Sequence, residues 1–119
     1  IIAGVEPVAT TKRAIDYITD VGAFPTVCIF RPTIDSEMEN VPPPDPEAMK
    51  EVFAYLHESC RRARLPIGIL PIEVSLVVQP EEAAGLIEPA IGDRIYAARN
   101  WSLRQLARPY IAFKKRPAA

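Results

Sequence analysis

The sequence predicts an α/β fold: a fragment of a partial (βα) barrel of the TIM type, with parallel strands, flanking helices and a helical C-terminal extension. Residues 1–3 form a short apolar strand that ends at Gly4. A helical pattern follows, and residues 24–30 form a second, mostly apolar strand without polar alternation. A strand–helix–strand repeat brings two strands together in parallel, and an unbroken apolar strand is typically covered on both faces. Because the chain opens inside its first strand, we expect the later part of a larger barrel.

The length and composition predict a single domain. The chain of 119 residues is near the commonest domain size. We expect the later βα units at residues 1–78 and the helical extension at residues 79–119. Apolar residues make up 49% of the chain and charged residues 24%, which is ordinary for a globular protein. The net charge of −1 excludes a strong overall attraction to nucleic acids or anionic membranes.

The cysteine content favours a cytoplasmic protein. Cys28 lies in an apolar strand and Cys60 on the apolar face of a helix. We interpret them as two buried reduced thiols, with a disulfide as the alternative. No signal peptide pattern begins the chain. The longest apolar run, residues 67–78, is interrupted by a proline and an acid and is too short to span a bilayer.

The first predicted helix follows the first strand directly. Thr10 or Thr11 can cap it, and it runs to about Val21, with Gly22 as its stop. Its apolar positions recur at helical spacing and predict the buried face. These positions are Ala14, Ile15, Ile18 and Val21.

A second helix is predicted after a loop at residues 32–45, which carries several acids and ends in three prolines. Loops of this length are often functional. Asp45-Pro46-Glu47 combines a capping residue, a proline at the first helical position and an early acid, which together predict a helix start. Arginines in the last turn and Pro66 predict its end. The buried face is expected to contain Met49, Val52, Phe53, Leu56 and Cys60.

The last third of the chain predicts two short strands and two further helices. Residues 67–70 and 73–78 are apolar enough for strands, and residues 80–87 suggest a short helix. A longer helix is expected from Gly92-Asp93 to about Arg108, closed by Pro109. Its expected anchors in the core are Ile95, Leu103 and Leu106.

Several motifs in order resemble the radical S-adenosylmethionine (SAM) enzymes, in particular the branch around biotin synthase. These motifs are Ile2-Ala3-Gly4-Val5-Glu6-Pro7, Gly22-Ala23-Phe24-Pro25, and Phe30-Arg31-Pro32-Thr33 with the acidic loop that follows. The resemblance covers residues 1 to about 78. It implies the C-terminal half of a barrel whose later strands lie against the adenine of SAM and whose loop faces the substrate. The complete enzyme would bind SAM and a [4Fe–4S] cluster.

The resemblance implies a set of site residues at the ends of the first two strands. The cofactor-binding residues would be Ile2, Gly4, Val5, Glu6, Phe30 and Arg31, and the residues facing the substrate would be Pro32, Thr33 and Glu73. Each has a structural alternative. Gly4 can simply permit a turn, and Arg31 can pair with an acid of the following loop instead of holding a carboxylate of SAM or substrate. Glu73 can lie at the exposed end of its strand.

The sequence departs from that family at its cluster ligands. The defining Cys-x-x-x-Cys-x-x-Cys motif is absent, and a cluster needs thiolate ligands. The isolated chain is therefore expected to bind no cofactor and to be inactive. His57 and Cys60 share one side of a helix, but two ligands make a poor zinc site, so no metal is predicted.

The alternative function is a stand-alone α/β interaction or scaffold domain. A half-barrel exposes strand edges, which invite pairing, so the expected partner is the N-terminal half of the barrel or a second copy. Seven of the fourteen basic residues fall in the last third of the chain, near Trp101 and Tyr110. A nucleic-acid surface is the weaker alternative, since amphipathic helices usually carry such charges as a solvated face.

Overall fold

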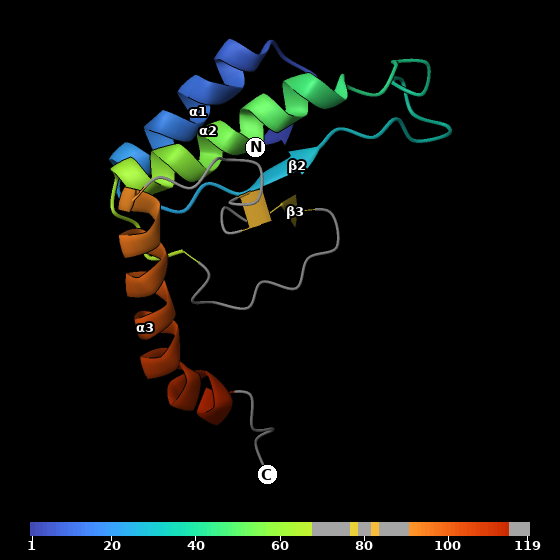
Figure 1. Ribbon diagram of the computed structural model, residues 1–119. Coiled ribbons are helices and arrows are strands. Elements are labelled where there is room, and N and C mark those ends of the chain that lie inside the picture. Colours follow the sequence, from blue (N-terminus) through green and yellow to red (C-terminus); the bar gives the residue numbers. More distant parts are fainter. Residues whose placement is uncertain (68–76, 79–81, 84–90, 115–119) are drawn as a thin grey trace.

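The computed structural model describes residues 1–67, 77–78, 82–83 and 91–114, and it is predominantly helical (Figure 1). Its elements in chain order are β1 (Ile2–Ala3), α1 (Val8–Asp20), β2 (Val27–Ile29), α2 (Pro46–Arg62), β3 (Val77–Val78) and α3 (Ile91–Lys114).

The three short strands form one sheet in the order β1-β2-β3. β1 and β2 are parallel, with Ile2 opposite Cys28 and Ala3 opposite Ile29. The amide of Cys28 donates to the carbonyl of Ile1 at 2.9 Å, and the amide of Phe30 donates to that of Ala3 at 2.8 Å. This part of the sheet has the parallel pairing that the strand–helix–strand repeat predicts.

The prediction of a partial TIM-type barrel with parallel strands is wrong. β3 runs antiparallel to β2, with Val78 opposite Val27. A barrel wall needs each strand to return parallel to the last through a helical crossover, whereas here only β1 and β2 are parallel among the described residues. The strands are two or three residues long, and helices make up most of the described chain. The pairing direction depends on tertiary contacts that apolar runs in the sequence do not encode.

α1 and α2 lie side by side in one layer over the sheet (Figure 1). The buried positions of α1 are Thr11, Ile15 and Thr19. The helix begins at Val8 after Pro7, earlier than the threonines suggested, and Val21 is 67% exposed instead of buried. Gly22 has a φ of +78° and follows the C-cap residue Val21, as expected of a stop residue.

Polar contacts join α1 to α2 beside the apolar core. Asp16 accepts hydrogen bonds from the hydroxyl of Tyr55 at 2.6 Å, from Arg62 at 2.8 Å and from Ser59 at 3.3 Å. Lys12 pairs with Glu51 at 2.6 Å near the other end of the helix pair. Because Asp16 has three donors from one helix, these contacts fix the register of α1 on α2.

The start and the buried face of α2 agree with the sequence. A carboxylate oxygen of Asp45 accepts from the amide of Ala48 at 2.9 Å, and Pro46 is the first helical residue. All five predicted face positions are buried: Met49, Val52, Phe53, Leu56 and Cys60. They form the core with side chains from α1, the sheet, α3 and the segments between these elements, namely Ala3, Ile15, Val27, Leu65, Ile67, Ala83 and Tyr96.

α3 differs from the prediction in its length and in its buried face. It continues through Pro109 to Lys114. Ile95 and Leu106, two of the expected anchors, are 68% and 77% exposed, while Tyr96 and Asn100 are buried. The helix touches the body through its first turns and extends away from it (Figure 1). The radius of gyration is 16.3 Å, against about 13.5 Å for a compact chain of this length.

Three expected segments fall wholly or partly outside the described residues. Of the two short strands, only Ile67, which lies in a turn, and β3 are described. Of the short helix expected at residues 80–87, residues 82–83 form a single turn of 3₁₀ helix. None of the described helices is long and apolar enough to cross a bilayer.

Candidate functional site

The parallel pairing of β1 and β2 brings the first predicted site to one edge of the sheet. Parallel strands have their carboxyl ends on the same side, so Gly4 to Glu6 and Phe30 to Thr33 lie at that edge. Ile2, Val5, Glu6, Arg31 and Thr33 are exposed there, while Gly4, Phe30 and Pro32 are half-buried. Glu73, the other residue predicted to face a substrate, lies outside the described residues.

The space above Gly4 is occupied by the loop. Gly4 has a φ of +99°, a conformation that side-chain-bearing residues rarely adopt. A Cβ built at Gly4 would lie 2.5 Å from Cβ and 2.6 Å from Cγ of Pro44. Gly4 therefore allows both a strained turn and close packing of the proline, which is the structural alternative for this position.

The loop at residues 31–45, which we call the acidic loop, is held by its own turns. The amide of Asp35 donates to a carboxylate oxygen of Glu39 at 2.9 Å, and the hydroxyl of Ser36 donates to the carbonyl of Thr33 at 2.7 Å. Within the described ranges, no ion pair joins Arg31 to an acid of this loop. The loop exposes its acids together with Ile34 and Met38, which are 84% and 37% exposed.

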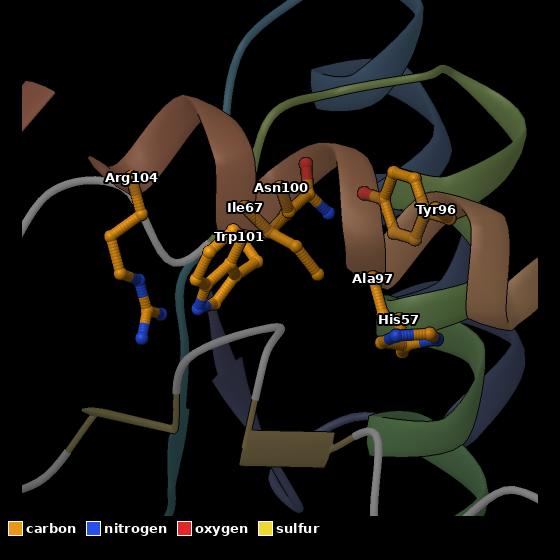
Figure 2. A pocket seen from close by; sticks show the side chains of 7 residues that line it. All are labelled: His57, Ile67, Tyr96, Ala97, Asn100, Trp101 and Arg104. Carbon is orange, nitrogen blue, oxygen red and sulfur yellow. The ribbon is translucent and has the colours of Figure 1, made fainter. Parts of the chain in front are cut away.

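A pocket of about 200 Å³ lies between the last turns of α2 and the first half of α3 (Figure 2). Its apolar lining comes from α3 and from Ile67 in the segment that follows α2. Its polar lining combines one imidazole, one amide, one phenol and one guanidinium. The residues are His57, Ile67, Tyr96, Ala97, Asn100, Trp101 and Arg104.

His57 is the buried imidazole at this junction. It is 6% exposed, and its ring meets that of Tyr96 edge-on, with centroids 6.0 Å apart. Burial lowers the pKa of His57 below 6.5, and Arg61 lowers it further, although Asp93 and Glu58 oppose the shift. The imidazole is therefore neutral near pH 7.

Tyr96 holds α3 to the end of α2. Its hydroxyl donates to the carbonyl of Leu65 at 2.6 Å, and burial raises the pKa of this phenol to about 12. Arg99 donates to the carbonyl of Arg64 at 2.7 Å, and Asp93 pairs with Arg61 at 3.0 Å. These contacts make the junction a polar clamp around the pocket.

Two polar atoms beside the pocket are buried without a hydrogen-bond partner. These are His57 Nδ1 and Asn100 Oδ1, and both atoms are sealed from solvent. His57 and Cys60 lie on the same helix, and in the parts of the chain that the structure covers no three metal-ligating side chains come together. Cys28 and Cys60 form no disulfide with each other; Cys60 is buried, as predicted, whereas Cys28 is only half-buried.

Among the described residues, several large apolar side chains are exposed on α3. Leu106, Tyr110 and Phe113 are four and three residues apart, and Ile95 lies eleven residues before Leu106, so all four share one face of the helix. The exposed fractions are 68% for Ile95, 77% for Leu106, 63% for Tyr110 and 72% for Phe113. We call these four residues the outer stripe. Trp101, 64% exposed, lies at the pocket mouth.

The outer stripe was not predicted, because two of its residues, Ile95 and Leu106, were expected to lie in the core. Two stripes run along α3, one with Tyr96 and Asn100 and one with Ile95 and Leu106. Hydrophobicity favours the second stripe, which is more apolar. The pattern that could have indicated the first is the pairing of a tyrosine with an asparagine one turn later, since both side chains can hydrogen-bond when buried.

The charges of the chain are segregated between its two ends. Residues 1–90 carry seven basic and fourteen acidic side chains, whereas residues 91–119 carry seven basic and one acidic. α3 itself has five basic residues, and its one acid, Asp93, is paired with Arg61. The outer stripe therefore belongs to a strongly positive helix. Comparison of the chain with protein-family models, with curated proteins and with solved structures gives no match in any of the three.

Proposed function

We propose that the chain is a protein-interaction module whose docking element is α3. The observation that carries the proposal is the outer stripe, four large apolar side chains on one face of a helix that extends from the body. Leu106, Tyr110 and Phe113 are neighbours over two turns, whereas Arg99 and Ser102 separate Ile95 from them. Exposed clusters of large apolar side chains mark interaction sites. An amphipathic helix that offers anchors at helical spacing fits the helix-in-groove mode of recognition.

The junction with the body supports this role. Four contacts fix the first turns of α3: those of Asp93, Tyr96, Arg99 and the edge of the His57 ring. The body then positions a helix whose outer half remains open to a partner. A docking helix held at one end is already ordered before it binds, which lowers the entropic cost of association.

The described fold gives no support to the radical SAM resemblance. The parallel barrel that it implies is absent from the described part of the chain, and Pro44 packs closely against Gly4. The resemblance stays a prediction from sequence motifs alone. The interaction module was the alternative function, and α3 supplies a specific surface for it in place of open strand edges.

Site-specific cross-linking tests the proposal. A photoreactive phenylalanine analogue at Leu106 should give discrete protein adducts on irradiation in native cells. The same analogue at Tyr17, 74% exposed on α1, is the matched control and should give none. Phe113→Ser in the Leu106 variant should abolish the adducts, because it removes a neighbouring anchor of the same stripe. Equal adducts at both positions, or none at Leu106, would contradict a docking role for α3.

A further inference from the structure

We infer that the partner of α3 is the acidic loop of a second copy of this chain. The inference rests on the proposed function, because it names what the outer stripe docks against. The acidic loop and α3 have complementary properties. Each exposes large apolar side chains, and they carry opposite charge.

The acidic loop and α3 carry opposite net charge. The acidic loop carries Asp35, Glu37, Glu39 and Asp45 against one basic residue, Arg31. α3 carries five basic residues against one paired acid. Opposite potentials on two surfaces steer their encounter and disfavour like-charged pairings. A dimer built from two α3 helices would bring two positive helices together and is disfavoured for that reason.

The apolar parts of the two segments also match. Ile34 is 84% exposed at the surface of the acidic loop, and Met38 adds a partly exposed, flexible thioether. The outer stripe offers Leu106, Tyr110 and Phe113 over two turns of helix. The internal hydrogen bonds of the loop hold its backbone in one conformation, so its apolar side chains form a surface that is in place before a partner binds.

The two surfaces cannot meet within one copy. The acidic loop follows β2 at one end of the molecule, while the outer half of α3 extends from the other end (Figure 1). The pairing must therefore occur between copies. Since it joins two different surfaces, it is a head-to-tail contact that forms rings or open chains.

Two single-surface variants test this pairing. Leu106→Ser/Phe113→Ser removes the α3 surface and keeps the loop, and Ile34→Ser/Glu37→Lys removes the loop surface and keeps α3. All four substituted side chains are exposed, so both variants should fold, which circular dichroism checks. Tyr17→Ser, exposed on α1, is the control.

Sedimentation equilibrium from about 1 µM to about 1 mM gives the readout. The wild-type chain and Tyr17→Ser should rise above the monomer mass of 13.2 kDa, and each single-surface variant should stay at that mass. An equimolar mixture of the two variants should form a dimer and stop there. In that dimer the intact α3 of one variant binds the intact acidic loop of the other. The two surfaces left over are the substituted ones, so no further copy can bind.

Other outcomes overturn the inference in distinguishable ways. If the loop variant still associates while the α3 variant does not, α3 docks elsewhere, and the proposed function survives. If both variants associate like the wild type, neither surface is used. If the wild type stays monomeric throughout, the second copy is excluded as partner, and the cross-linking at Leu106 then decides the proposed function separately.

Discussion

Gly4 shows at the residue scale how a motif residue can be required for packing. Its φ of +99° and the contact with Pro44 both exclude a Cβ. The contact joins the turn after β1 to the end of the acidic loop. A sequence can reveal that a glycine follows a strand, but the partner forty positions later becomes evident only in the folded chain.

Gly4→Ala should destabilise the fold more than Gly22→Ala. Both glycines have positive φ, so both substitutions introduce backbone strain of about 1–2 kcal/mol. Nothing lies within 4 Å of a Cβ at Gly22, whereas Pro44 must move at Gly4, which adds about 1–3 kcal/mol. Thermal or denaturant unfolding of the two variants measures the difference. Equal losses would show that Pro44 moves at no cost.

His57 makes stability depend on pH. Its pKa is 6.5 in the unfolded chain and lower in the folded state, chiefly through burial, so the unfolded chain binds more protons between these values. The stabilisation is therefore full above pH 6.5 and is lost as the pH falls through the folded pKa. The charged groups that act on His57 from α2 and α3 are Asp93, Glu58 and Arg61, and the phenol of Tyr96 stays neutral. Denaturant unfolding from pH 7 to about pH 5 should show the decline. His57→Gln should flatten it, and an unchanged slope would contradict the assignment.

At the scale of elements, α2 was predictable and α3 was only partly so. Asp45, Pro46 and five apolar positions at helical spacing all indicate one helix with one buried face. α3 has large apolar residues on two faces, so periodicity alone could not choose between them. The choice depends on the carbonyl of Leu65, which accepts from Tyr96 and belongs to another part of the chain. The antiparallel direction of β3 was also unpredictable, because it depends on contacts between segments that are distant in the sequence.

Phe53→Ala tests the buried face of α2. Phe53 is 5% exposed within the core, and truncating a buried phenylalanine costs about 3–5 kcal/mol. Tyr17→Ala, at a 74% exposed site on α1, is the matched aromatic control and should change stability by less than about 0.5 kcal/mol. Denaturant unfolding compares the two. Similar losses would place Phe53 outside the core.

At the scale of the whole molecule, the chain is not compact and its negative and positive segments lie at opposite ends. The negative acidic loop and the positive α3 lie at opposite ends of the molecule, and the radius of gyration exceeds that of a compact chain. The candidate site at the strand ends could be placed from sequence, since parallel pairing follows from the repeat. The docking surface could not, because its exposure depends on how α3 leaves the body.

Self-association should weaken as salt is added. Exposed charges are screened over about 10 Å at 0.1 M salt and about 3 Å at 1 M, so the attraction between α3 and the acidic loop declines. The weight-average mass at fixed concentration should fall between these two conditions. Sedimentation velocity measures it, with the mixture of the two single-surface variants as a defined dimer. If the contact were apolar only, the weight-average mass would stay constant or rise in high salt, which would contradict the role of charge.

Pro109 links helix formation in the outer part of α3 to binding. A proline has no amide hydrogen, so the carbonyl of Gln105 lacks its usual donor four residues on. Tyr110 and Phe113 follow this interruption in a segment far shorter than the 12–15 residues that an isolated helix needs in water. Their amides should therefore exchange hydrogen quickly in the free chain and slowly when the stripe is covered. Slow exchange in the last turns of α3 would therefore show that a partner covers the outer stripe. The free energy of ordering these turns would then reduce the affinity for that partner.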